Sequence, residues 1–282
     1  MKQVDDFINQ VKILPPAPRT LTELLPLLNQ ADVPAGRVVE VIRYDPVLTA
    51  KILRRCNSAA FGLNQPVDDL LDALVRLGFN EVYRLAAVAI AETTLGGAQP
   101  GYGFNQGNLW EHSVVTALGS RFLARSLGSD ENQAFTAALL HDIGKTVLSN
   151  TLEKAYTDIM KETQGSGHSL VEAEKILIGV EHAEIGGRLL ERWGFPENLV
   201  RSVWYHHDPL QAQAHKHLAA CIYVGDLIAH MLGYAEGHQA YAVRSRAEAM
   251  HLLEISAKEI ELLMLQTDAA LETMDWFTRK AT

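Results

Sequence analysis

Apolar residues recur along most of the chain with the 3.6-residue period of an amphipathic α-helix. Leu21, Leu24, Leu25 and Leu28, for example, fall on one face of such a helix. No two segments show the alternation of apolar and polar residues that paired β-strands require, and no internal repeat or low-complexity tract interrupts the helical pattern. The pattern therefore predicts an all-α protein.

Capping residues divide this pattern into separate helices. Asp45 followed by Pro46 is typical of a helix start, with the aspartate as N-cap and the proline in the first helical position. Ser129 is expected to cap the helix that carries His141 and Asp142. The other predicted helices cover residues 69–77, 81–95, 109–126, 153–164, 169–178, 181–193 and 218–232, and a last one runs from Ser256 to near Trp276.

A glycine-rich segment, Gly96–Gly103, is the strongest linker signal in the chain. We place a boundary between two packed helical lobes there. The expected organisation is an N-terminal helical lobe over residues 1–100, a second helical lobe over 101–232 and a C-terminal helical extension over 233–282.

Composition narrows the classes of function. The net charge of −9 over 282 residues argues against non-specific binding to nucleic acid or to an anionic membrane. The two cysteines, Cys56 and Cys221, form no CxxC motif, so neither a disulfide framework nor a thiolate zinc site is expected. The polar opening segment and the lack of a long apolar run indicate a cytoplasmic protein without a membrane span.

Histidines and aspartates are scattered over the predicted helices of the second lobe. Each histidine alone is more often a hydrogen-bonded structural residue than a ligand, but together they could complete a pair of metal sites, with Asp142 as the bridging carboxylate. Imidazole and carboxylate ligands suit iron first, with manganese or zinc as alternatives, and two neighbouring metals are a recurrent device for hydrolysing phosphate esters. The candidate ligands are His112, His141, Asp142, His182, His206, His207 and Asp226.

Two charged residues add to this interpretation. Asp226 lies in an apolar run, where burial is costly unless the carboxylate is paired or bound to a cation. Lys145 follows His141 by four residues and Asp142 by three, so it shares their helix face. There it could neutralise a substrate phosphate or protonate a leaving oxygen, which makes Lys145 and Asp142 the candidate catalytic residues. The alternative is a solvated lysine near a helix end.

The ordered pattern resembles the HD superfamily of metal-dependent phosphohydrolases, and in particular its HD-related output domain (HDOD) branch. The segments that carry the likeness are Leu14–Pro18, Asp45–Leu53, Cys56–Ala59, Ala73–Gly78, Ala137–Lys145, His182–Leu190 and Trp193–Pro196. The resemblance implies an HD-type helical bundle over 101–232. It also implies one metal held by His112, His141, Asp142 and Asp226, and a second held by Asp142, His182, His206 and His207, as in the HD-GYP phosphodiesterases.

Two functional interpretations follow from the resemblance. The first is a bacterial signal-transduction output domain that retains the dinuclear site and binds signalling proteins or a small nucleotide. The second is an active phosphohydrolase or phosphodiesterase acting on a nucleotide-type phosphoester. The complete ligand set favours catalysis. The chain lacks a Gly-Tyr-Pro motif after His207, however, and reads Asp208-Pro209 instead. This departure and the family resemblance favour the signalling role.

Overall fold

The computed structural model describes residues 2–11, 14–30, 33–58, 61–152, 158–159, 162–163, 168–235 and 247–274. These ranges contain α-helices and short 3-10 helices and no β-strand, which confirms the all-α prediction. The helix predicted over 153–164 and the end of the last helix near Trp276 lie largely outside the described residues. No described helix combines the length and apolar character that crossing a bilayer requires.

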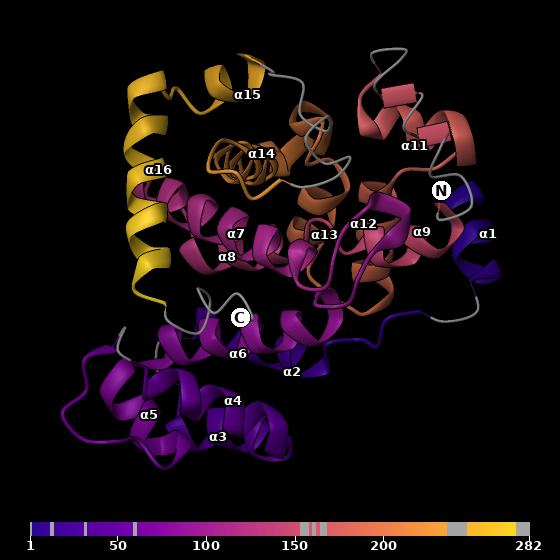
Figure 1. The fold of residues 1–282 in the computed structure, drawn as a ribbon. Helices are drawn as coiled ribbons and strands as arrows, with labels where there is room; N and C mark the ends of the chain where they lie inside the picture. The colour runs from indigo at the N-terminus through magenta and orange to yellow at the C-terminus, as the bar shows by residue number, and fades with distance from the viewer. Residues whose placement is uncertain are drawn as a thin grey trace.

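Residues 19–95 form a layer of helices below the rest of the molecule, whereas the first helix, Lys2–Gln10, lies at the right beside the helices of the second lobe (Figure 1). The Asp45 carboxylate accepts a hydrogen bond from the amide of Leu48, which confirms the predicted N-cap. Gly78, with a φ of 79°, separates two helices by a turn. The elements are α1 (Lys2–Gln10), α2 (Arg19–Leu24), η1 (Leu25–Asn29), α3 (Ala35–Arg43), α4 (Pro46–Cys56), α5 (Leu70–Leu77) and α6 (Phe79–Leu95).

The predicted linker, residues 96–103, lies in a strap over residues 96–107 that includes the 3-10 helix η3 (Pro100–Tyr102). Half of the strap's residues are exposed, whereas Gln99, Gly101, Tyr102 and Phe104 are buried. The strap closes on itself, because the amide of Gly107 donates to the carbonyl oxygen of Gly96 and a β-bridge joins Gln99 to Phe104. Tyr102 and Phe104 are buried, and η3 packs against α9 (Gly144–Leu152). A segment that its glycines marked as a linker therefore contributes two aromatic side chains, Tyr102 and Phe104, to the core.

Among the remaining helices, α7 (Asn108–Ser126) packs against α8, α14 and α16. One continuous apolar core runs from the side chains of α1–α6 into those of α7–α13, so the two lobes are packed together as predicted. The elements are α8 (Glu131–Leu140), α11 (Leu170–Ile178), α12 (His182–Arg192), α13 (Glu197–Trp204), η6 (Pro209–His215), α14 (Lys216–Met231), α15 (Ala247–Leu252) and α16 (Ala257–Glu272).

Two details of α8 differ from the prediction. Its N-cap is Asp130 and not Ser129, since the aspartate carboxylate accepts hydrogen bonds from the amides of Asn132 and Gln133. The helix ends at Leu140, so His141 and Asp142 lie in a turn between α8 and α9 and not on a helix. On a helix, two successive side chains would point about 100° apart. In the turn, the side chains of His141 and Asp142 both reach the same buried region.

Two glycines allow helices to approach at backbone distance. A Cβ on Gly144 would overlap the carbonyl oxygen of His182 and lie 2.8 Å from the amide nitrogen of Gly186, so α9 and α12 touch there. A Cβ on Gly225 would overlap Ser120 Oγ and lie 2.6 Å from the carbonyl oxygen of Thr116, which joins α14 to α7. Gly144 lies two residues after Asp142, and Gly225 directly precedes Asp226, so both contacts adjoin predicted metal ligands.

Candidate functional site

The seven predicted ligands converge on one buried region. They come from α7, from the turn after α8, from the first residue of α12, from the turn after α13 and from α14. Six of the seven side chains are buried, and His207 is half-buried. Segments up to 114 residues apart in sequence therefore build a single site, as the order of the motifs predicted.

The Asp142 carboxylate lies at the centre and faces two groups of histidines. Its Oδ2 lies 3.3 Å from Nε2 of His141 and 3.7 Å from Nε2 of His112. Its Oδ1 lies 3.2 Å from Nε2 of His182 and 4.0 Å from Nε2 of His206. Two oxygens of one carboxylate thus point toward two separate sets of nitrogen atoms, which is the arrangement that a bridging carboxylate requires.

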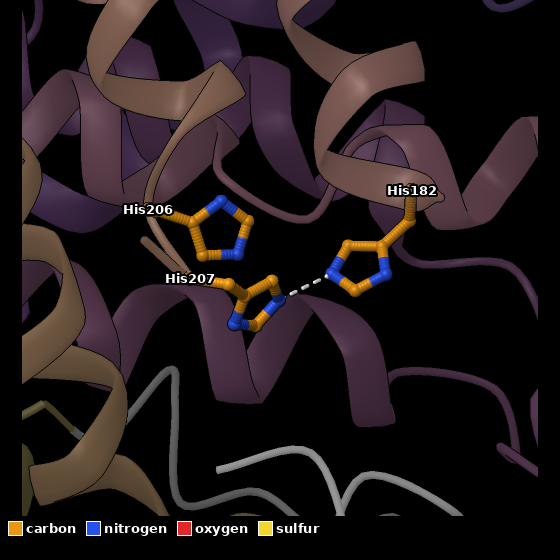
Figure 2. A group of neighbouring side chains, drawn as sticks. All are labelled: His182, His206 and His207. Atoms are coloured by element: carbon orange, nitrogen blue, oxygen red, sulfur yellow. Dashed lines mark hydrogen bonds between the residues drawn. The ribbon is translucent and has the colours of Figure 1, made fainter. Parts of the chain in front are cut away.

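Each group could hold a divalent ion. The ligand atoms of His112, His141 and Asp226 lie within 4.8 Å of one another, and Asp226 Oδ1 is 3.0 Å from His112 Nε2. The ligand atoms of His182, His206 and His207 lie within 4.8 Å of one another as well. In Figure 2 these three imidazole rings face a common space, and a hydrogen bond of 2.8 Å joins Nε2 of His207 to Nε2 of His182.

In four of the candidate histidines Nε2 faces Asp142, and the other ring nitrogen, Nδ1, makes a hydrogen bond to the surrounding protein. His182 directs Nδ1 at the Glu174 carboxylate, at 2.8 and 3.0 Å. Three others direct Nδ1 at a backbone carbonyl oxygen: His112 at Tyr234 (2.9 Å), His141 at Ala138 (2.7 Å) and His206 at Val203 (2.7 Å). Metal-binding histidines characteristically use the second ring nitrogen in this way, because the hydrogen bond fixes the tautomer and the ring orientation.

The electrostatics of the site favour a cation. Burial lowers the pKa of His112, and burial together with the neighbouring His141 lowers the pKa of His206 to about 3, so both imidazoles are neutral and carry a free lone pair. Burial opposes ionisation of Asp142, but His141 and Lys145 hold its pKa well below its usual range. Neutral imidazoles and ionised carboxylates are the protonation states that metal binding needs. His182 differs, because the Glu174 carboxylate raises its pKa to about 9, so this imidazole would have to release a proton to bind a metal.

Several buried polar atoms of this region also lack hydrogen-bond partners. Nε2 of His112, Nε2 of His206 and Oδ1 of Asp226 make no hydrogen bond of acceptable geometry within the described part of the chain, although all three atoms are shielded from solvent and the first and last lie 3.0 Å apart. An unsatisfied buried polar group costs about 1–3 kcal/mol. A cation would satisfy these atoms at once, so the residues present fit the divalent metal that the sequence predicted.

Lys145 points into the site and is not solvated, so the alternative of an exposed lysine is wrong. Its side chain is 1% exposed, and Nζ donates a 2.6 Å hydrogen bond to Asp142 Oδ2. The same Nζ lies 5.9 Å from the ring centroid of Tyr102 and 6.0 Å from that of Phe104. The strap therefore covers the lysine side of the metal-ligand cluster with two aromatic rings.

Two residues of the site, Glu174 and His230, were not among the site residues predicted from the sequence. Glu174 is fully buried against His182, although a glutamate on an amphipathic helix is ordinarily solvated. His230 has Nε2 3.4 Å from Asp226 Oδ1, and its ring meets that of His112 edge-on with centroids 5.5 Å apart. Its position four residues after Asp226 was the available signal, because such residues share a helix face.

These features define a buried cluster of histidines and carboxylates that could hold metal ions, and comparison with known proteins gives the family. The HDOD domain model matches residues 14–209, so the chain belongs to the HDOD family. A protein of Treponema pallidum (strain Nichols) without an assigned function is 26% identical over 216 residues, which cover 73% of this chain and 40% of the relative. The chain thus spans less than half the length of the curated relatives that it matches.

Two solved structures share the fold. A protein of Shewanella amazonensis SB2B, named provisionally as a phosphohydrolase, superposes with a TM-score of 0.69 and 26% identity over 94% of this chain and 97% of its own. A protein of Marinobacter aquaeolei VT8, named provisionally as a signal transduction protein, superposes with a TM-score of 0.77 and 21% identity over 99% of this chain and 65% of its own. The helical architecture described above is therefore that of the family.

Proposed function

We propose that this chain is a signal-transduction module that binds two divalent metal ions in a buried HD-type site and reports their presence, or that of a small phosphate ligand, to a partner protein. One ion is held by His112, His141 and Asp226, and the other by His182, His206 and His207, with Asp142 shared between them. The observation that carries the proposal is the division of the Asp142 oxygens between two groups of histidines.

The surroundings of Lys145 favour regulation over turnover. Its ammonium group is paired with Asp142 and covered by Tyr102 and Phe104, so the cation that would receive a phosphate is enclosed in the protein interior. A binding event that displaced the strap would uncover this lysine. The strap joins α6 to α7, and its displacement would therefore reach the interface between the two lobes.

A second candidate function is hydrolysis of a phosphate ester. The complete set of ligands and the inward direction of Lys145 favour it, as does the likeness to the Shewanella protein. When bound, two divalent ions would supply Lewis-acid polarisation of the ester and activation of water. In this function Lys145 would leave Asp142 and neutralise charge on the phosphate oxygens.

Elemental analysis of anaerobically purified protein tests the proposal. We expect about two equivalents of iron, manganese or zinc in the wild type, as in other dinuclear sites, and a loss of metal in Asp142→Ala and in the isosteric Asp142→Asn. The matched control is His168→Ala, since this histidine is 38% exposed and paired with Glu162 outside the site. A wild type without bound metal, even after reconstitution with Mn²⁺ or Fe²⁺, would overturn the proposal.

An activity assay separates the two candidate functions. Hydrolysis of bis(p-nitrophenyl) phosphate by the metal-loaded wild type, abolished in Lys145→Met, would establish the enzyme. Full metal occupancy without hydrolysis, together with altered protease sensitivity of the strap on adding inorganic phosphate, would support the signalling module.

A further inference from the structure

A chain of three buried side chains connects the strap to the site. The Tyr102 hydroxyl donates a 2.7 Å hydrogen bond to Glu174 Oε1, and the Glu174 carboxylate accepts from Nδ1 and from the backbone amide of His182, each at 2.8 Å. All three residues are 0% exposed. The two ends of this chain lie 80 residues apart in sequence.

The Glu174 carboxylate is fully engaged by these contacts. One oxygen receives the Tyr102 hydroxyl and the imidazole, and the other receives the imidazole and the amide of His182. A buried carboxylate is tolerated only where such donors replace water. Its negative charge opposes the effect of burial on His182 and raises the pKa of that imidazole to about 9. The hydrogen bonds also hold a proton on Nδ1, so Nε2, which faces the centre of the site, is the nitrogen that would lose its proton when a metal binds.

The position of Tyr102 is itself fixed. The neighbouring amide of Gly101 donates to Ser149 Oγ at 3.2 Å, and the bridge between Gln99 and Phe104 closes the strap on either side. The Tyr102 and Phe104 rings are stacked, with centroids 5.7 Å apart. Tyr102 is therefore held in place by the backbone of the strap and by α9, and it does not depend on Glu174 for its orientation.

We propose that Glu174 and Tyr102 are positioning residues for His182: the strap holds Tyr102, Tyr102 holds Glu174, and Glu174 orients the His182 imidazole toward the metal. This inference rests on the proposed function, in which His182 is a metal ligand. Through these contacts the strap, which joins the two lobes, would set the metal affinity of the group that contains His182, His206 and His207.

Metal titration of three variants tests the inference. Removal of a partner that orients a metal-binding histidine typically lowers metal affinity about 10–100-fold. We expect a loss of this size in Glu174→Gln and a smaller loss, several-fold, in Tyr102→Phe. The matched control is Tyr83→Phe, because Tyr83 is also 0% exposed and its hydroxyl also makes a 2.7 Å hydrogen bond, to Thr136, outside the ligand cluster.

Absorption spectra of the Co²⁺-loaded proteins separate orientation from general loss of stability. A change in the orientation of His182 alters the visible d–d bands, so we expect altered spectra in Glu174→Gln and Tyr102→Phe and an unchanged spectrum in Tyr83→Phe. In a double-mutant cycle, Tyr102→Phe should have little further effect once Glu174→Gln is present, since the tyrosine acts through the carboxylate.

The outcomes distinguish this inference from the proposed function. Tight Co²⁺ binding by the wild type, with equal affinities and identical spectra in Tyr102→Phe, Glu174→Gln and Tyr83→Phe, would overturn the positioning roles and leave the metal site intact. Equal losses in Tyr83→Phe and Tyr102→Phe would also overturn them, because the effect would then be one of core stability. Absence of metal binding by the wild type would overturn the proposed function and this inference together.

Discussion

Lys145 and Asp142 form an ion pair in the protein interior, with Nζ 2.6 Å from Oδ2 and both side chains 1% exposed. Removal of one partner from such a pair leaves an uncompensated buried charge, which typically costs about 3–5 kcal/mol. We expect Lys145→Met to lower the free energy of unfolding by several kcal/mol in the presence of a chelator. The loss should be smaller with Mn²⁺ or Zn²⁺, because the bound ion would compensate Asp142.

Urea denaturation with and without metal measures this difference. Arg76→Met provides the control, since Arg76 and Asp72 form an ion pair of 2.7 Å whose side chains are 31% and 26% exposed. Such a pair contributes about 0–1 kcal/mol. A loss in Lys145→Met that is as small as the loss in Arg76→Met, or one that metal does not reduce, would contradict the prediction.

Metal binding should also stabilise the wild type as a whole. A ligand that binds only the folded state at 100 times its dissociation constant adds about 2.7 kcal/mol to the free energy of unfolding. We therefore expect the Tm to rise by several degrees when Mn²⁺ or Zn²⁺ replaces EDTA. Differential scanning fluorimetry of wild type, Asp226→Asn and His168→Ala tests this, and only Asp226→Asn should lose the shift. Equal Tm values for the wild type in EDTA and in metal would refute it.

The contact at Gly225 predicts a combined effect on stability and on metal binding. Alanine there would force α14 away from α7, because its Cβ overlaps Ser120 and crowds Thr116. Overpacking of this kind costs about 1–3 kcal/mol, and the displacement of α14 carries Asp226 with it. Gly36→Ala in α3 is the control, since a Cβ there meets no atom within 4 Å. We expect Gly225→Ala alone to lose both stability and metal affinity in parallel titrations.

Both cysteines should be inert in the folded protein. Burial raises the pKa of Cys56 to about 11 and that of Cys221 to about 12, so almost no thiolate exists at pH 8. We expect negligible reaction with Ellman's reagent in native buffer and release of two equivalents of chromophore in denaturant, from the two cysteines of the chain. Rapid reaction of either thiol at pH 8 without denaturant would show that its surroundings open.

The sequence predicted much of the site because its ligands follow a demanding order. His141, His182 and His206 could be assigned from the residues around them, and the all-α fold followed from the helical period. The position of His141 in a turn could not be predicted, because the apolar run before it continues without a break. Whether a helix ends at Leu140 depends on packing that only the folded chain provides.

Glu174 could not be found by the same reasoning. It lies on α11, eight residues before His182, and nothing local separates a glutamate that is buried against a histidine from one that faces water. The burial of Tyr102 and Phe104 in the strap was also hidden, because glycine and proline mark turns whether these lie at the surface or inside. Long-range contacts, such as those of Tyr102 with Glu174 and of Gly101 with Ser149, distinguish the two cases.

The absence of a side chain at Gly144 bears on the size of the ion that the site accepts. At Gly144, α9 and α12 meet through their backbones, close to Asp142 and His182, whose Oδ1 and Nε2 lie 3.2 Å apart. Iron, manganese and zinc bind at about 2.0–2.2 Å, whereas Ca²⁺ needs about 2.3–2.6 Å and several more oxygen ligands. Helices that are joined through their backbones cannot move apart to admit those additional ligands without losing this contact, so we expect these two segments to favour a transition metal over calcium.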